Sequence, residues 1–521
     1  MSEFTRHGSL QRACCRIAGA ARPCVFTFLL LGIAGAATAA STDPKYRVTD
    51  IGTLGGSGST GINLNERGQV TGSSATAGDA AQHAFLWKNN GTRMVDIGAL
   101  GIAEGYGTGY YVNASGQVAG EVRKFDDAGN QWSFLWRNDG TPAKNFGIAT
   151  SVSGLNDAGQ VVVNVDGRAA VWMNDGRPLQ YIGTLGGNTA LGRDINARGQ
   201  VTGYSYQAYP DNREYHAFVW RNDGTAMVDL GTLGGSQSFG YFINASGQVA
   251  GRSNVRVGTA AYRAFLWRND GTAMVNLGTL GGFLSEPYAL NDRGQVVGTS
   301  TTVRKLNDTR HAFAWMNDGR PMRDLGTLGG ASSDAWDINA YGWVVGSAAT
   351  ANQQGHAFLW RNDGRGMRDL NSLIDPADPL EPYVVLVSAE KINDAGDILA
   401  YGYDTRGGGS GTYFLRGTSL GLDPRALAFG NQAVGTLSAI RSVTVENRTT
   451  SAVAVTSIAL QGSTPGQFVA TNDCGSSLAG QASCTIKVRF KPTTTGAKSA
   501  TLTVNGGGGG LRTVTLAGRG T

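Results

Sequence analysis

The sequence is poor in proline and in net charge, and most of it has almost no cysteine. It holds 13 Pro against 78 Gly in 521 residues, and the glycines follow no three-residue period, which excludes a collagen-like triple helix. The net charge is only +5, and residues 1–40 supply much of it through four arginines and one glutamate. The remainder is close to neutral, so the chain lacks the basic footprint of a nucleic-acid-binding protein.

Long apolar runs are also absent after residue 40. Residues 24–36 form an apolar stretch shorter than the ~20 residues that span a bilayer, so we expect no transmembrane segment. The small residues Ala37-Thr38-Ala39 follow it, a pattern typical of a signal-peptidase site. We therefore predict a signal peptide over residues 1–39 and export to the periplasm or the exterior, with an uncleaved anchor as the alternative.

Cysteine usage agrees with export. Three of the five cysteines fall within the predicted signal peptide, which leaves Cys474 and Cys484. A close pair in an exported protein predicts one disulfide. The rival interpretation, a metal site built on the two thiols, lacks a nearby histidine to complete it.

One unit recurs through residues 46–417 and carries three motifs. They are Asn-x-x-Gly-Gln-Val, His-Ala-Phe-Leu-Trp and Asp-Leu-Gly-Thr-Leu-Gly-Gly, in this order. The His-Ala-Phe-Leu-Trp motif and its variants end on a tryptophan in seven copies. We expect these tryptophans to lie in the hydrophobic core. The Asn that opens the first motif occurs eight times, at Asn65, Asn113, Asn156, Asn196, Asn244, Asn291, Asn339 and Asn393.

Each unit is predicted to form four strands. The Asn-x-x-Gly turn joins the first two, and Asn-Asp-Gly closes the hairpin between the third and fourth. In the third strand both faces are largely apolar, so the sheet must be covered on both sides. A repeated four-stranded unit of ~45 residues predicts the blade of a β-propeller; a parallel β-helix would need shorter coils.

The number of strands indicates how the ring closes. Eight first-strand motifs occur, but the earliest fourth strand, Tyr46–Leu54, precedes all of them, and the last unit ends without one. The simplest solution pairs Tyr46–Leu54 with the last blade, which leaves no exposed sheet edge. We therefore predict an eight-bladed propeller over residues 45–417, with seven blades as the alternative.

These motifs resemble the HAF-repeat proteins of bacterial exteriors, named for the His-Ala-Phe tripeptide. The tripeptide occurs at His83, His216, His311 and His356, and is altered in the copies at Trp132, Arg168 and Arg263. The resemblance covers residues 46–417 and implies export and a repeat fold. It brings no established activity and no catalytic residues.

Residues 421–521 lack the repeat and predict about seven short strands, the size of an immunoglobulin-like β-sandwich. The segments Leu427–Gly430, Val443–Asn447 and Cys484–Pro492 resemble the choice-of-anchor D family. That family is similar to sandwiches of the ASH and major-sperm-protein type. The resemblance implies an accessory adhesive or spacer module.

The repeated histidines do not predict a metal centre. One copy per blade, two strands outside the innermost strand, leaves neighbouring histidines on the order of 10 Å apart, whereas zinc holds its ligands at roughly 2 Å. We expect each histidine to hydrogen-bond to an adjacent turn. No nucleophile elbow, HExxH or phosphate-loop motif occurs, so we predict no cofactor and no motif-borne catalytic site.

The connections opposite the Asn-x-x-Gly turns vary among the copies and are rich in aromatic residues, which suit glycans or protein surfaces. We therefore predict a monomeric, non-enzymatic binding protein for a glycan or protein ligand. A carbohydrate-active propeller lyase or hydrolase, or a structural envelope component, are the alternatives. The candidate ligand-binding residues are Tyr106, Tyr110, Tyr204, Tyr206, Tyr209, Tyr215, Tyr288 and Trp336.

Overall fold

A computed structural model describes most of the chain after residue 44. The described ranges are 45–101, 105–124, 131–148, 150–208, 214–302, 309–376, 378–407, 409–417, 420–424, 426–447, 452–480, 482–506 and 510–521. The predicted signal peptide therefore lies outside them. The described residues form strands and three short 3-10 turns, η1 (Ala77–Asp79), η2 (Leu370–Leu373) and η3 (Pro465–Gln467). No helix in these ranges is long and apolar enough to cross a membrane.

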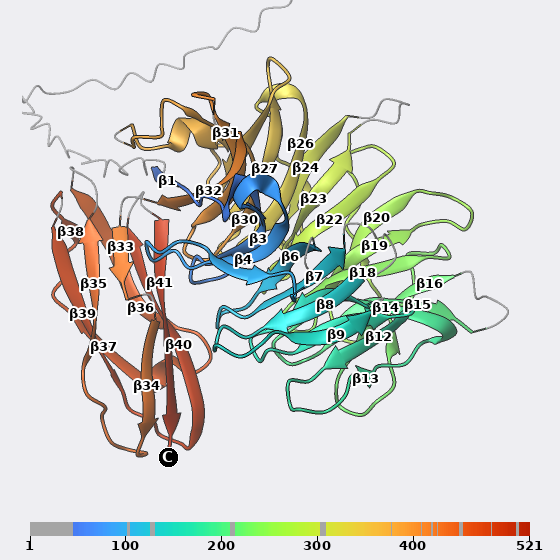
Figure 1. The fold of residues 1–521 in the computed structure, drawn as a ribbon, viewed down its shortest axis with the longest axis horizontal. Coiled ribbons are helices and arrows are strands. Elements are labelled where there is room, and N and C mark those ends of the chain that lie inside the picture. Colours follow the sequence, from blue (N-terminus) through green and yellow to red (C-terminus); the bar gives the residue numbers. More distant parts are fainter. Residues whose placement is uncertain are drawn as a thin grey trace, which may run out of the picture. The chain divides into compact units, whose positions relative to one another are not determined.

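The repeat region forms consecutive antiparallel sheets along the chain (Figure 1). Four of them have four strands each, and two have eight strands, in which a single parallel bridge joins two sets of four. We call each set of four strands a unit. The first four units are β2 (Gly55–Leu64), β3 (Val70–Thr76), β4 (Gln82–Trp87), β5 (Val95–Gly98); β6 (Gly105–Val112), β7 (Val118–Lys124), β8 (Gln131–Trp136), β9 (Lys144–Ile148); β10 (Thr150–Leu155), β11 (Val161–Val165), β12 (Arg168–Trp172), β13 (Gln180–Tyr181); and β14 (Gly186–Ile195), β15 (Val201–Gln207), β16 (Tyr215–Trp220), β17 (Val228–Asp229).

The last four units follow the same order. They are β18 (Ser238–Ile243), β19 (Val249–Asn254), β20 (Tyr262–Trp267), β21 (Val275–Asn276); β22 (Ser285–Leu290), β23 (Val296–Thr301), β24 (Arg310–Trp315), β25 (Arg323–Asp324); β26 (Gly329–Ile338), β27 (Val344–Thr350), β28 (Gly355–Trp360), β29 (Met367–Asp369); and β30 (Val384–Ile392), β31 (Ile398–Asp404), β32 (Ser410–Gly417) with β1 (Tyr46–Asp50). This is the architecture of a β-propeller.

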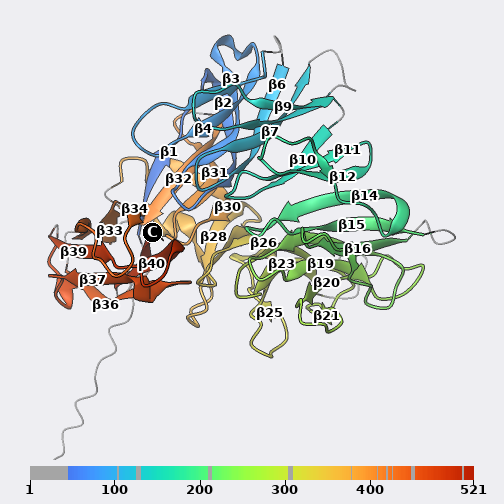
Figure 2. The same cartoon turned by 90° about the horizontal axis from the view of Figure 1, so that it is seen from below.

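The pairing predicted between the start of the repeat region and its last unit is confirmed. Strand β1 lies antiparallel to β32, with Tyr46 opposite Gly417 and Asp50 opposite Tyr413 (Figure 2). The strand is shorter than the predicted Tyr46–Leu54, because the chain leaves β32 at Gly52, which has φ +76° and makes the turn into β2.

Neighbouring units are held together by apolar side chains that face one another across each gap. Phe265 and Trp267 of one unit, for example, pack against Ala217, Val219 and Leu230 of the unit before it. The phenylalanines of the third strands are fully buried, and six of the seven motif tryptophans are 3–8% exposed. The prediction that these tryptophans are core is confirmed; Trp136 is half-buried.

The conserved turns form a closed cycle of hydrogen bonds. Asn244 shows the pattern: its Oδ1 accepts from the amides of Ser246 and Gln248, and its Nδ2 donates to Gln248 Oε1 and to the carbonyl of Asn291 in the next unit. Gly247 at φ +79° completes the turn. All eight asparagines donate to the next copy's carbonyl at 2.8–3.2 Å, and Asn393 returns to Asn65.

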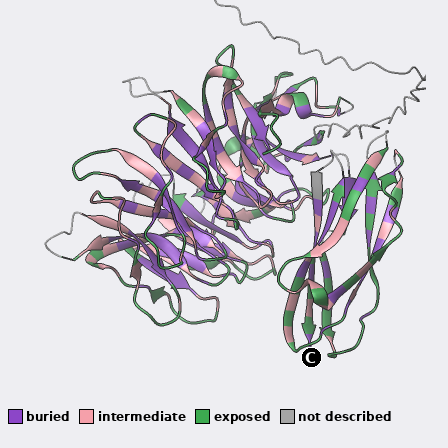
Figure 3. Cartoon of the chain, turned by 180° about the vertical axis from the view of Figure 1, so that it is seen from behind, coloured by how far each residue is buried: buried purple, intermediate pink, exposed green. Residues whose placement is uncertain are grey.

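Residues 420–521 form a β-sandwich of nine described strands, two more than predicted. One sheet has the order β33 (Leu420–Asp423), β35 (Arg441–Asn447), β39 (Ser483–Phe490), β37 (Phe468–Asn472), and the other β34 (Ala426–Gln432), β41 (Gly510–Gly520), β40 (Gly496–Gly506), β36 (Val453–Gln461), β38 (Ser477–Leu478). Buried and exposed residues alternate along the second half of β35. Figure 3 colours the chain by burial and shows buried and exposed segments on the strands near the C-terminus.

The predicted disulfide joins Cys474 and Cys484, whose Cα atoms are 5.0 Å apart. Cys484 lies in β39 and is buried in the sandwich core with Val445, Ile486 and Leu478. Within the described residues, the one grouping of metal-ligating residue types is Asp473 with these two cysteines. Because both thiols are consumed in the disulfide, this grouping does not form a metal site.

Candidate functional site

The first strand of each unit contains a β-bulge at the same place in the repeat. In every copy the pairing register shifts just before the motif Asn. The inserted residue is the third one before that Asn, so that Tyr241, for example, is inserted three positions before Asn244. Bulges re-aim a side chain and are frequent beside functional sites. The geometry is repeated but the residue is not: Ile62, Tyr110, Ser153, Arg193, Tyr241, Tyr288, Trp336 and Glu390 occupy it.

Arg252 of β19 lies at the centre of the most elaborate cluster at this level. Its Nη1 contacts both carboxylate oxygens of Glu286 in β22, at 3.1 and 2.9 Å, and so links two units. Its guanidinium carbon also lies 4.6 Å from the ring centre of Tyr262, 5.3 Å from that of Phe239 and 5.8 Å from that of Tyr241. Three rings around one cation form a rigid, charged and aromatic surface.

Burial and charge affect the tyrosine beside this cation. Burial raises the pKa of the Tyr241 hydroxyl, and the nearby Glu286 carboxylate raises it further. Tyr241 therefore stays neutral at physiological pH, and its hydroxyl keeps a proton that it can donate.

A cavity of about 470 Å³ opens beside Arg252, between the fifth and sixth units. Arg252, Tyr262, Glu286, Tyr288, Thr299 and Arg310 are among the residues that line it. Its volume falls in the range of about 300–1,000 Å³ that small-molecule sites occupy. The lining combines charged and hydroxyl groups with apolar and aromatic surface, so the cavity suits a ligand that has both polar groups and an apolar face.

A second cluster of three tyrosines lies in the fourth unit. The rings of Tyr206 and Tyr215 are 4.1 Å apart, and their hydroxyls hydrogen-bond to each other. That bond, together with burial, raises the pKa of Tyr215 to about 12. The ring of Tyr204 contacts Phe239 at 4.9 Å, which connects this cluster to the rings around Arg252.

Two further groups contain the other predicted aromatic residues. Tyr288 and Trp336, from adjacent units, stack on each other. Their ring centres are 4.8 Å apart and their planes differ by 30°, which makes a flat platform. Tyr106 and Tyr110 line a smaller cavity of about 210 Å³ with Glu121 and Arg123. Tyr209 lies outside the described residues.

The structure corrects the predicted location of these aromatics. They were assigned to variable connections, but Tyr106, Tyr110, Tyr204, Tyr206, Tyr215, Tyr288 and Trp336 all lie in strands. The reason is that the strands extend further than their motifs. The first strands β6, β22 and β26 contain Tyr106, Tyr110, Tyr288 and Trp336, the second strand β15 runs to Gln207, and the third strand β16 begins at Tyr215. Sequence reasoning also missed Phe239, Tyr241, Arg252, Tyr262 and Glu286, which alignment of the copies on the motif Asn would have exposed as polar or aromatic positions that differ among copies.

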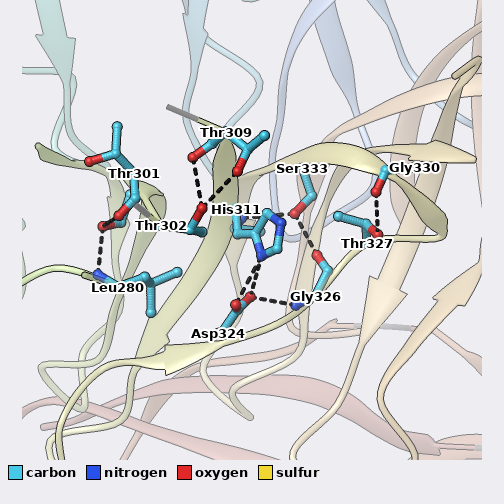
Figure 4. Close-up of polar contacts among 12 residues, drawn as sticks. Leu280, Thr301, Thr302, Thr309, His311, Asp324, Gly326, Thr327, Gly330 and Ser333 are labelled. Atoms are coloured by element: carbon cyan, nitrogen blue, oxygen red, sulfur yellow. Dashed lines mark hydrogen bonds and ion pairs between the residues drawn. The ribbon is translucent and has the colours of Figure 1, made fainter. Parts of the chain in front are cut away.

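The histidines have the structural role that the sequence predicted. His311 Nδ1 lies 3.0 and 2.9 Å from the two carboxylate oxygens of Asp324, which also accepts from the amide of Gly326 (Figure 4). The same pair, thirteen residues apart, recurs at His83, His216 and His356. In a copy without histidine, Arg168 instead lies 5.1 Å from the ring centre of Tyr181, which occupies the Asp position.

Ser333 lies near this pair, so that a serine, a histidine and an aspartate, the residue types of a hydrolase triad, occur together. They do not form the hydrogen bonds of a triad. Ser333 Oγ donates to the carbonyl of Gly326 at 2.6 Å and accepts from the amide of Ala312 (Figure 4). Its proton is therefore directed at a backbone carbonyl rather than at His311, and the group holds a turn in place.

Family comparisons assign parts of the chain. Residues 419–512 match the ASH family, described as abnormal spindle-like microcephaly-associated, ASPM–SPD-2–Hydin, which confirms the ASH-like prediction for the sandwich. Residues 235–408 match DUF3466, a family described as of unknown function. No curated protein sequence matches the chain.

Solved structures give distant similarities. The ASH/PapD-like domain 7 of human CEP192 matches at 14% identity and TM-score 0.17, covering 20% of this chain and 86% of that one. The β-propeller domain of the Trilobed protease from Pyrococcus furiosus matches at 12% sequence identity and a TM-score of 0.39. The match covers 64% of this chain and 100% of that domain. Dipeptidyl peptidase 4 from Porphyromonas gingivalis matches at 10% sequence identity and a TM-score of 0.43. The match covers 70% of this chain and 59% of that one. Similarities at these TM-scores carry no functional inference.

Proposed function

We propose that this chain is an exported, monomeric, non-enzymatic binding protein whose propeller takes a glycan or protein ligand. The observation that carries the proposal is the set of bulge positions, where a repeated scaffold presents six different residue types among the eight copies. A structural role alone would favour the same residue at each copy, as it does for the motif Asn. Residues that vary on a constant frame are the usual arrangement of a recognition surface.

Charge is arranged differently at two places in the propeller. Glu286 is paired with Arg252, and the His–Asp pairs hold turns, which favours binding there. Glu66, Asp292, Asp337 and Asp394 line one cavity of about 330 Å³, and these carboxylates support the alternative of a carbohydrate-active enzyme. Stacked Tyr288 and Trp336 instead offer a flat surface suited to a sugar ring or a peptide.

The propeller is proposed to close as a ring of eight blades. The cycle of asparagine hydrogen bonds through all eight copies and the pairing of β1 with β32 support this number. A ring without edges provides a rigid support for the binding residues. The ASH-type sandwich is proposed to act as an accessory or spacer module, and its disulfide supports an extracytoplasmic location.

The experiment that tests this function is a glycan and peptide array probed with the mature protein and variants. Trp336→Ala and Tyr206→Ala should each weaken binding of the array ligand by about tenfold or more, because central aromatics dominate interfaces. Tm should change little, since both side chains are partly exposed.

The matched control is Tyr181→Ala. Tyr181 is 49% exposed and lies in the outermost strand of its unit, away from the bulge positions. Its loss should leave binding unchanged. If Asn196→Ala at a turn abolishes binding without unfolding the protein while the aromatic variants bind normally, the working face is the opposite one.

A further inference from the structure

Two residues that line the cavity between the fifth and sixth units each contain a buried polar atom without a partner among the described residues. Arg252 Nε and Thr299 Oγ1 have no hydrogen-bond partner in the part of the chain that the structure describes. Thr299 is only 4% exposed, and both residues line the same cavity. Buried polar groups nearly always find a partner, and leaving one unsatisfied costs ~1–3 kcal/mol. Two of them in one cavity indicate that a polar ligand supplies the missing bonds.

The charges of the cavity define the sign of that ligand. Arg252 and Arg310 bring two positive charges, and Glu286 brings one negative charge. The cavity therefore carries one excess positive charge, which a single carboxylate would neutralise. Arg252 binds Glu286 through Nη1, so its Nε edge is directed away from that salt bridge and can donate to a second anion.

The remaining lining favours a sugar over a peptide. Thr299, Ser300 and Thr301 follow one another along β23, and Tyr262 and Tyr288 add aromatic faces. Hydroxyls and a carboxylate match the many hydroxyls of a saccharide, and aromatic faces match the apolar face of its ring. An apolar peptide side chain would meet mainly Leu284 and Ala260.

We propose that this cavity binds an acidic saccharide through the carboxylate of a uronic acid residue. The inference rests on the proposed binding function and specifies its ligand class. The carboxylate accepts hydrogen bonds from Arg252 Nε and Arg310. The sugar hydroxyls bond to Glu286 and to Thr299 Oγ1, and the ring lies beside Tyr288, whose partner Trp336 extends the platform for the next sugar.

Calorimetric titration of the mature protein with an oligogalacturonide, and with the neutral galactose oligomer of equal length, tests the proposal. The acidic oligomer should bind at least about tenfold more tightly, and added salt should weaken it, because the contact is charge-assisted. Arg310→Gln should reduce affinity about tenfold and remove most of the salt dependence. Arg177→Gln, an exposed arginine of a different unit, is the charge-matched control.

Thr299 provides the sharper pair of variants. Thr299→Val keeps the shape of the side chain but removes the unpartnered hydroxyl. It should lower the affinity for the acidic oligomer about tenfold. Thr299→Ser keeps the hydroxyl and should bind as the parent does. Tm should not fall in Thr299→Val, because the hydroxyl has no partner in the described part of the protein.

The outcomes separate this proposal from the broader one. Equal affinity for the acidic and neutral oligomers, or Thr299→Val and Arg310→Gln binding like the parent, would overturn the uronic acid assignment. If a neutral glycan or an acidic peptide then binds and Trp336→Ala abolishes its binding, the broader binding function stands and the ligand class is wrong. If no glycan or peptide responds to Trp336→Ala either, both proposals fail.

Discussion

The two ends of β16 show how differently the repeat treats its two edges. Trp220, at the end beside the Asn-Asp-Gly turn, is 5% exposed and packs with Ile182 and Ile195 of the neighbouring unit and its own. Tyr215, at the other end of this six-residue strand, stacks on Tyr206 and is partly exposed. The first residue recurs in seven copies, whereas the second recurs only as Tyr262 and is replaced elsewhere by other residue types.

The comparison shows that the contacts repeated in the units lie mostly at one edge. The asparagine turns and six buried motif tryptophans lie there. Tyr206 and Tyr215 lie in the half of their strands toward the other edge, where the copies differ. The bulge residues also differ, although they lie only three positions before the motif Asn, where the bulge re-aims their side chains.

The largest expected effect comes from Trp220→Ala at the constant edge. Removing this buried ring should destabilise the protein by about 3–5 kcal/mol, since it leaves a cavity between two units. Chemical denaturation followed by fluorescence measures the change. Tyr206→Ala in the adjacent strand is the control, and a loss of stability in Tyr206→Ala larger than in Trp220→Ala would reverse the assignment of the two edges.

A slightly smaller effect is expected for Asn196→Ala. The change removes two accepted backbone bonds, from Arg198 and Gln200, and two donated ones, to Gln200 Oε1 and the Asn244 carbonyl. At ~0.5–1 kcal/mol for each of the four bonds, the loss should be about 2–4 kcal/mol. Urea denaturation measures it, with exposed Asn188→Ala as the matched control. Equal stability of the two variants would show that the cycle contributes nothing.

The smallest expected effect is a pH dependence at Asp194, two residues before Asn196. Burial raises the pKa of its carboxyl to about 7, against which the amides of Ile243 and Ile195 and the charge of Lys391 act. A carboxyl whose pKa is higher in the folded state favours folding when protonated. Its contribution is therefore full below pH ~4 and is lost as pH rises through about 7.

Asp194→Asn should consequently match the parent in Tm near pH 4 and exceed it increasingly toward pH 8. Scanning calorimetry across this range measures the difference. Asp157→Asn, at an exposed turn, provides the background slope. A Tm difference that stays constant with pH would show that the Asp194 carboxyl is ionised at all these values.

Features that recur in most copies of the repeat could be predicted from the sequence. The asparagine turns, the buried tryptophans and the pairing of Tyr46 with the last unit all follow from comparing the copies with one another. The disulfide followed from the two cysteines that lie outside the predicted signal peptide.

The binding region could be predicted only in part, because it depends on contacts between different copies. Tyr204, Tyr215 and Trp336 were identifiable as aromatics in variable positions. The contact between Arg252 and Glu286 was not, since the two residues lie 34 positions apart and meet only when adjacent sheets face each other. The bulge was also invisible, because its inserted residue has no fixed identity.

The asparagine cycle has an electrostatic consequence for the region it supports. Each side-chain amide donates to the next copy, and the last donates to the first, so successive bonds point in different directions around the cycle. Their dipoles therefore partly cancel, whereas the peptide dipoles of a helix are parallel and add. The cycle links the eight copies without concentrating charge at one end, as a helix terminus does.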